Sequence, residues 1–194
     1  MSGRDRIVLS LALVAVAALV VPVAATASSA PARSYPHFRS LYIRMPDGVR
    51  LAADVWLPAG TTAASRLPTV LETDRYWRDR AYSGGIKNNP NYNIAKPRNA
   101  RGYAYVFADL PGTGASFGTL RGELGSAMIA DVGSLADWIA ARPWSDGRVG
   151  VTGVSYSADA AMLSLALRNH HITAAAPSCG WRWPGRPAWT GSMK

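Results

Sequence analysis

Cysteine, histidine and acidic residues are scarce in this chain of 194 residues, which has one cysteine, three histidines and 12 acidic side chains. Because Cys179 is the only cysteine, no disulfide can form within the molecule. Nothing in the sequence suggests a metal site or a cofactor, and we expect neither. The three histidines also limit which residues could act as a general base.

The chain is basic, with 21 lysines and arginines and a formal net charge of +9. A nucleic-acid-binding protein would gather these charges on one face or interleave them with stacking aromatics. Here the arginines are scattered through every segment, which argues against nucleic-acid binding. The charge favours attraction to an anionic surface instead.

The first 27 residues have the order of a secretory signal peptide. Arg4 and Arg6 precede an apolar run over residues 7–21, which is followed by Pro22 and a small-residue site at 25–27. This order predicts export and cleavage, and a secreted or cell-envelope location of bacterial type. Removing the leader takes away one net positive charge and leaves +8.

An uncleaved membrane anchor is the alternative for this leader. Residues 7–25 are just long enough to cross a bilayer. Pro22 and the small residues after it favour cleavage. Membrane contact is therefore expected only if the leader stays attached.

After an Ala/Ser/Pro-rich arm at 28–38, short apolar runs alternate with helical patterns. A turn at Pro46-Asp47-Gly48 joins two segments typical of an antiparallel hairpin. Further strands are predicted at 69–72, 103–108 and 172–176, helices at 126–141 and 157–168, and a loop with at most a short helix at 79–98. This alternation predicts an α/β fold, a mostly parallel sheet with helices on both faces and the hairpin at its edge.

The helix predicted at 126–141 has one apolar face. Its members are Met128, Ile129, Val132, Leu135, Ala136 and Ile139. Asp131 and Asp137 lie on the same helix, which we expect to pack on the sheet, so we interpret both as structural. Asp109, where the strand at 103–108 ends, is expected to cap its turn by hydrogen bonds to the backbone.

Residues 147–161 place a short apolar run, a Gly-x-Ser-x-small turn and a helix in direct succession. This order is typical of a nucleophile elbow, which lifts a serine hydroxyl out of the sheet toward a base and oxyanion donors. Small residues are needed two positions before and after the serine, and Gly153 and Ser157 hold them. Ser155 is the candidate nucleophile. The alternative is an ordinary strand-to-helix loop, because the short motif is common.

Four further blocks surround the elbow in the sequence. They are 47–58, beginning Asp-Gly-Val-Arg-Leu; 71–78, Leu-Glu-Thr-Asp-Arg-Tyr-Trp-Arg; 101–118, containing Asp-Leu-Pro-Gly-Thr-Gly; and 137–150, containing Pro-Trp-Ser-Asp-Gly-Arg. In order and spacing, residues 41–177 resemble the CocE/NonD hydrolases, the cocaine-esterase and Xaa-Pro dipeptidyl-peptidase group of α/β-hydrolases. The resemblance covers the N-terminal portion of that family, here residues 39–177.

The resemblance implies a serine hydrolase in which Ser155 attacks the carbonyl of a small ester or peptide substrate. It also implies that the backbone N–H of Tyr156 and the hydroxyl of Tyr76 form the oxyanion hole. Without the resemblance, Tyr76 could equally be a half-buried aromatic after a strand. Two positions depart from the family pattern: Ser157 replaces the usual Gly, and Pro111 stands where Arg is common.

The histidine of a serine triad is missing from the expected place. In this fold the order along the chain is Ser, acid, His. After Ser155 only His170 and His171 follow, at the far end of the helix that starts at the elbow, over ~20 Å away at ~1.5 Å per residue. We interpret them as surface or loop-end residues. His37 lies in the arm and has no assigned role.

The last segment, 178–194, is rich in Trp, Arg and Pro and has no helical or strand period. It suits either an interfacial surface tail or a shortened gene product whose final residues no longer encode the family fold, which is the interpretation we favour. We therefore expect a fold that is incomplete at its C-terminus. The alternative to a secreted hydrolase is a truncated, non-catalytic exported fragment that retains only binding or no activity; the sequence does not indicate an oligomeric state.

Overall fold

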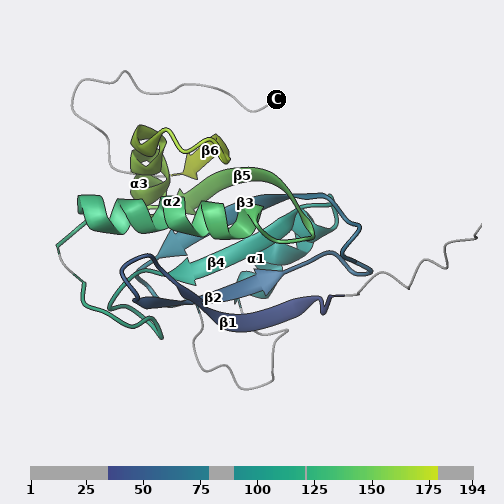
Figure 1. Ribbon diagram of the computed structural model, residues 1–194, viewed down its shortest axis with the longest axis horizontal. Helices are drawn as coiled ribbons and strands as arrows, with labels where there is room; N and C mark the ends of the chain where they lie inside the picture. The colour runs from purple at the N-terminus through teal and green to yellow at the C-terminus, as the bar shows by residue number, and fades with distance from the viewer. Residues whose placement is uncertain (1–34, 79–89, 121, 179–194) are drawn as a thin grey trace, which may run out of the picture. The chain divides into compact units, whose positions relative to one another are not determined.

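The computed structural model describes residues 35–78, 90–120 and 122–178 (Figure 1). The predicted signal peptide, most of the arm at 28–38 and the tail from residue 179 lie outside the described residues. Among the helices that the structure does describe, none is long and apolar enough to span a bilayer.

Six strands form one mixed sheet in the order β1-β2-β4-β3-β5-β6. The strands are β1 (Phe38–Arg44), β2 (Arg50–Trp56), β3 (Leu67–Asp74), β4 (Ala104–Asp109), β5 (Ser145–Val154) and β6 (Ile172–Ser178). The four strands β3, β4, β5 and β6 run parallel to one another, whereas β1 is antiparallel to β2 and β2 is antiparallel to β4. The predicted parallel sheet with an antiparallel hairpin at its edge is confirmed.

The hairpin turn forms where the sequence predicts it. The Met45 N–H donates to the Val49 carbonyl at 2.8 Å, and the Gly48 N–H donates to the Met45 carbonyl at 2.9 Å. The Asp47 carboxylate accepts a hydrogen bond from the Val49 N–H at 2.9 Å, and this side-chain contact further stabilises the turn.

Helices cover both faces of the sheet, as predicted (Figure 1). On one face, α2 (Ser126–Ala140) and α3 (Tyr156–Ser164) pack on the larger core. All six apolar residues predicted for the buried face of α2 are buried. The second helix is shorter than predicted, because α3 ends at Ser164 and continues only as a 3-10 turn, Leu165–Leu167.

The other face carries a helix that the sequence pattern under-predicts. Helix α1 (Pro90–Asn99) has ten residues where we expected a loop with at most a short helix. Pro90 suits the first turn, where its missing N–H costs nothing, but Pro97 lies inside the helix and removes a hydrogen bond. Tertiary packing compensates, because Ala95 is fully buried against Trp56, Tyr105 and Phe107.

The parallel strands end at one edge of the sheet. The last residues of β3 and β4, Asp74 and Asp109, are paired across the ladder, and Glu72 of β3 pairs with Thr152 of β5. Ser155 follows β5 directly. Ligand sites of open α/β sheets lie outside the carboxyl ends of the strands, so this edge is where a site is expected.

Candidate active site

Ser155 occupies a sharp turn between β5 and α3. Its backbone has φ 57° and ψ −121°, a conformation that a non-glycine residue adopts only at a cost of about 1–3 kcal/mol. Three backbone hydrogen bonds hold it there. The Ser155 N–H donates to the Ser178 carbonyl at 3.1 Å, and the Ser155 carbonyl accepts from the N–H groups of Ala158 at 2.9 Å and Asp159 at 3.1 Å. The residue is exposed, so its hydroxyl can meet a substrate.

Strand and helix almost touch at this turn. A Cβ built on Gly153 would lie 2.3 Å from the Ser157 Cβ and 2.4 Å from the Ser157 carbonyl carbon. Only glycine fits there, which confirms the steric reason for a small residue two positions before Ser155. Ser157 is fully buried, and its side chain hydrogen-bonds to the Asp74 carboxylate. The departure from glycine at this position thus adds a link between the elbow and β3.

Tyr156 begins helix α3, so its backbone N–H has no acceptor within the helix. Such an N–H beside the nucleophile is suited to bind an oxyanion, and the positive end of the helix dipole adds to it. The Tyr156 ring is buried, and its hydroxyl contacts the Met128 sulfur at 2.9 Å. Burial raises the pKa of this phenol, so it stays neutral.

The segment after β3 brings Tyr76 to the same edge. The Asp74 carboxylate accepts the backbone N–H groups of Arg75 at 2.6 Å and of Tyr76 at 3.1 Å, which fixes the turn. Burial raises the pKa of Asp74 from its ordinary value, while these hydrogen bonds act in the opposite direction. The Asp74 carbonyl also accepts the Leu110 N–H at 2.9 Å, so β4 is tied to the same turn.

Tyr76 is 44% exposed, and its ring lies 6.2 Å from the Tyr156 ring in an edge-to-face arrangement. Its side chain and Ser155 line the same cavity. The structure therefore brings together the three predicted site residues, Ser155, Tyr156 and Tyr76, from two different loops.

The cavity beside Ser155 has a volume of about 400 Å³. It lies between the ends of β3 and β5 and the start of α1. Its lining residues are Glu72, Asp74, Tyr76, Trp77, Arg78, Pro90, Asn91, Ile94, Phe107, Val154, Ser155 and Ser157. Burial raises the pKa of Glu72, whose carboxylate accepts the Tyr105 hydroxyl hydrogen bond at 2.8 Å.

Arg78 is a site residue that sequence reasoning missed. Its guanidinium forms ion pairs with the buried carboxylates of Asp54 on β2 and Asp109 on β4. Asp109 also accepts the Arg78 backbone N–H at 2.6 Å and the Ala115 N–H at 3.1 Å. The predicted cap by Asp109 is confirmed, and the aspartate additionally anchors the loop that carries Tyr76. A Cβ on Gly114 would lie 2.2 Å from this carboxylate, so the turn needs glycine.

Pro111 follows at the start of the turn Leu110–Thr113. The Thr113 N–H and hydroxyl both donate to the Leu110 carbonyl, at 3.1 and 2.8 Å. A proline is well suited to the second position of such a turn.

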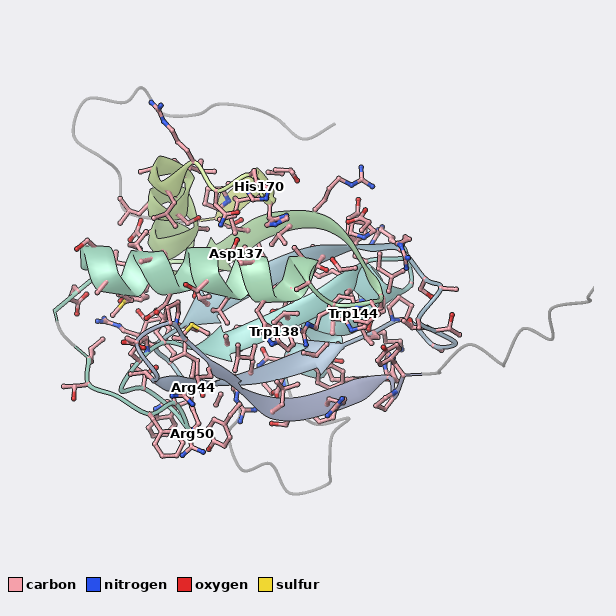
Figure 2. All side chains as sticks on the ribbon, viewed as in Figure 1. Arg44, Arg50, Asp137, Trp138, Trp144 and His170 are labelled. Atoms are coloured by element: carbon pink, nitrogen blue, oxygen red, sulfur yellow. The ribbon has the colours of Figure 1, made fainter. Side chains whose placement is uncertain are left out.

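All three histidines lie at the opposite end of the sheet from Ser155. The His171 Nδ1 contacts the Gly147 carbonyl at 2.9 Å, near the start of β5, so roughly 25 Å of strand separates it from Ser155. His170 stacks on His171 and is labelled beside β6 in Figure 2. His37 contacts the carbonyl of Leu57, which follows the last residue of β2. That end of β2 pairs with the start of β4, so it lies at the edge of the sheet opposite Ser155. None of the three can accept a proton from Ser155 within one molecule, as the sequence indicates.

The two helix aspartates lie outside the site. Asp137, labelled in Figure 2, accepts a hydrogen bond from the Asn169 side-chain amide at 2.7 Å and so ties α2 to the loop before β6. This contact agrees with the predicted structural role. Within the described part of the chain, no cluster of three or more His, Cys, Asp or Glu side chains could hold a metal ion.

The strand order, the elbow after β5 and the helices on both faces define an α/β-hydrolase fold. The family model of the X-Pro dipeptidyl-peptidases (S15 family) matches residues 47–186. The chain belongs to this family, and the expected resemblance to the cocaine-esterase and Xaa-Pro dipeptidyl-peptidase group is confirmed by this match and by the sequence relatives below.

Proteins named as esterases are among the similar sequences. A Mycobacterium bovis protein named as a candidate serine esterase is 39% identical over 162 residues, covering 74% of this chain and 25% of its own length. Cocaine esterase of a Rhodococcus strain is 29% identical over 123 residues, covering 63% of this chain and 20% of its own. The chain therefore spans a quarter or less of the length of these relatives.

Solved structures share the fold. A CocE/NonD family hydrolase from Staphylococcus aureus superposes with a TM-score of 0.59 at 22% identity, covering 71% of this chain and 26% of the other. An α-amino acid ester hydrolase has a TM-score of 0.59 at 25% identity, covering 85% of this chain and 30% of the other.

Proposed function

We propose that this chain carries the nucleophile of a serine hydrolase that acts on ester or peptide bonds through an acyl-serine intermediate. The observation that carries the proposal is the strained, exposed Ser155 at a cavity of about 400 Å³, beside Tyr156 and Tyr76. The relatives named as esterases support it. The family match also favours a hydrolase over a non-catalytic fragment.

The reaction has two steps. The Ser155 oxygen forms a bond to the substrate carbonyl carbon, and the bond to the leaving alcohol or amine breaks as that group takes a proton. Water then attacks the acyl-serine, releases the carboxylic acid and restores the serine. The Tyr156 N–H and the Tyr76 hydroxyl would donate to the oxyanion that forms in each step.

Proton transfer needs a base, and within the described part of the chain no histidine lies at the site. The three histidines lie at the other end of the sheet. We therefore propose that the triad acid and histidine come from a segment outside these 194 residues. The relatives have the length to contain one, since this chain spans a quarter or less of them.

A fluorophosphonate probe tests the proposal directly. Intact-mass measurement should show slow labelling of this chain, abolished by Ser155→Ala and slowed by Tyr76→Phe. Joining the C-terminal segment of a longer relative should raise the rate by several orders of magnitude, because the triad acts as a unit. Labelling that persists in Ser155→Ala would contradict the assignment of the nucleophile.

We also propose that the protein is exported, on the basis of its first 27 residues. A mature N-terminus at or near Ser28 in the extracellular or envelope fraction, found by mass spectrometry, would support this. Recovery of only the intact form starting at Met1 in the membrane fraction would contradict cleavage.

A further inference from the structure

Arg75 lies immediately before Tyr76 and above the aromatic pair of the candidate site. Its guanidinium carbon is 4.5 Å from the centre of the Tyr156 ring and 5.3 Å from the centre of the Tyr76 ring. A cation at these distances is attracted to the face of an aromatic ring. Arg75 therefore contacts both residues that are placed to bind an oxyanion.

Two further contacts hold the guanidinium in this position. Glu123, from the loop before α2, forms an ion pair with the Arg75 Nη1. Tyr156 is buried and presents a fixed ring surface beneath the cation. Although the Glu123 carboxylate is 65% exposed, the Arg75 side chain is only 28% exposed. The arginine thus keeps one orientation rather than extending into solvent.

The guanidinium brings a positive charge next to the Tyr76 side chain, with its carbon 5.3 Å from the centre of that ring. Arginine can only donate hydrogen bonds, so it leaves the O–H hydrogen of Tyr76 available for an acceptor. A nearby cation makes a phenol O–H a stronger donor, because it favours the negative charge that builds on the phenol oxygen when that O–H donates. The contact therefore suits Tyr76 to donate to a negatively charged oxygen.

We propose that Arg75 is a positioning residue of the oxyanion site, which orients and polarises the Tyr76 hydroxyl through the chain of contacts Glu123, Arg75, Tyr76. This rests on the proposed function, in which Tyr76 donates to the oxyanion. Arg75 does not touch the reacting atoms. Its positive charge adds to the field at the place where negative charge develops.

The test uses the rate at which a fluorophosphonate labels Ser155 in this chain, followed by intact-mass spectrometry over hours. In that reaction the Ser155 oxygen displaces fluoride from phosphorus, and its proton passes to water. The variants are Arg75→Gln, Arg75→Lys and Glu123→Gln. Arg148→Gln is the matched control, because Arg148 is an exposed arginine that pairs with Asp146 near the start of β5.

We expect Arg75→Gln to lower the labelling rate about tenfold, and Glu123→Gln to lower it less. Removing a single oxyanion donor lowers a reaction rate by about 10²–10³-fold, and Arg75 acts only indirectly, through one such donor. Arg75→Lys should recover part of the rate, because it keeps the charge. Added salt should slow the native chain but not Arg75→Gln. Arg148→Gln should label at the native rate.

A double-mutant cycle separates positioning from a purely structural effect. In the Tyr76→Phe background, Arg75→Gln should have little further effect, since both changes remove the same interaction. Equal rates for Arg75→Gln and the native chain, or additive losses in the double variant, would overturn the inference and leave Ser155 as the nucleophile. Labelling that survives Ser155→Ala overturns the proposed function and this inference with it. If Arg75→Gln does not fold, Glu123→Gln, a change at an exposed side chain, replaces it in the cycle with Tyr76→Phe, and the same result is expected.

Discussion

At the scale of single residues, Ser155 shows how much a short motif can specify. Two small residues at the required spacing predict a sharp strand-to-helix turn, and the structure has Ser155 at φ 57° with Gly153 against Ser157. The spacing was sufficient because the constraint is steric and local. The partners Arg75 and Arg78 escaped prediction, because their contacts depend on residues brought together only by the fold.

The strain at Ser155 predicts an unusual order of stabilities. Neither Ser155→Gly nor Ser155→Ala retains the hydroxyl, but only glycine adopts a positive φ without cost. We expect Ser155→Gly to unfold at higher urea concentration than Ser155→Ala, by about 1 kcal/mol. Equilibrium unfolding followed by circular dichroism measures the difference. In an ordinary helix or strand, an alanine variant is more stable than the glycine variant at the same position. If Ser155→Ala proved more stable than Ser155→Gly, the backbone at Ser155 would not be strained.

At the scale of elements, periodic segments were predictable and aperiodic ones were not. The apolar face of α2 and the strands of the sheet follow regular spacings, and the structure has them with ends shifted by a few residues. Helix α1 lacks such a pattern and contains Pro97, so local sequence argues against it. It forms because Ala95 and its neighbours cover the aromatic face of β2 and β4.

The contact between β5 and α3 gives a second prediction. In Gly153→Ala the new methyl would overlap both the side chain and the backbone of Ser157. Strand and helix must then separate, and we expect a loss of about 1–3 kcal/mol in the free energy of unfolding, together with slower labelling of Ser155.

Gly150 is the matched control in the same strand. A Cβ there would meet only the Thr69 carbonyl oxygen, at 3.9 Å. Gly150→Ala should therefore leave stability and labelling nearly unchanged. Adding Ser157→Gly to Gly153→Ala should recover only part of the loss, because the backbone overlap at 2.4 Å remains. Full recovery would mean that the side chain alone sets the contact.

At the scale of the whole molecule, stability should depend on the charge of Asp131. Burial, with a smaller effect of Asp47 in the hairpin turn, raises the pKa of Asp131 from 3.8 to about 6. The folded chain therefore binds a proton more readily than the unfolded chain between about pH 4 and pH 6. The free energy of unfolding should fall as pH rises through this window.

Replacing the carboxyl tests this directly. Asp131→Asn should be more stable than the native chain at pH 7 and should lose this advantage at pH 3.5. Burial also raises the pKa values of Glu72, Asp74 and Asp109, so variant and native chains must be compared at the same pH. Urea unfolding at several pH values is the measurement. If the difference in free energy of unfolding between Asp131→Asn and the native chain did not vary with pH, the raised pKa of Asp131 would be contradicted.

The sheet also predicts how the molecule behaves at high concentration. Among the described strands, β6 has a neighbour on one side only, and exposed edges pair with other chains. Ala174→Lys places a charge on β6 and should reduce self-association in sedimentation velocity. Ala59→Lys adds the same charge in an exposed loop and should not. An equal response of the two variants would show a general effect of charge.

The hydrogen bond between the Ser155 N–H and the Ser178 carbonyl links the candidate nucleophile to the last residue of β6. During synthesis at the ribosome, the elbow emerges before the strand that holds it in place. The Ser155 N–H then finds this acceptor only after β6 has been made and has paired with β5. A nascent chain that ends before Ser178 would carry Ser155 without this hydrogen bond, so that only the bonds accepted by its carbonyl would hold the turn. The elbow is therefore complete only once the polypeptide has passed this point.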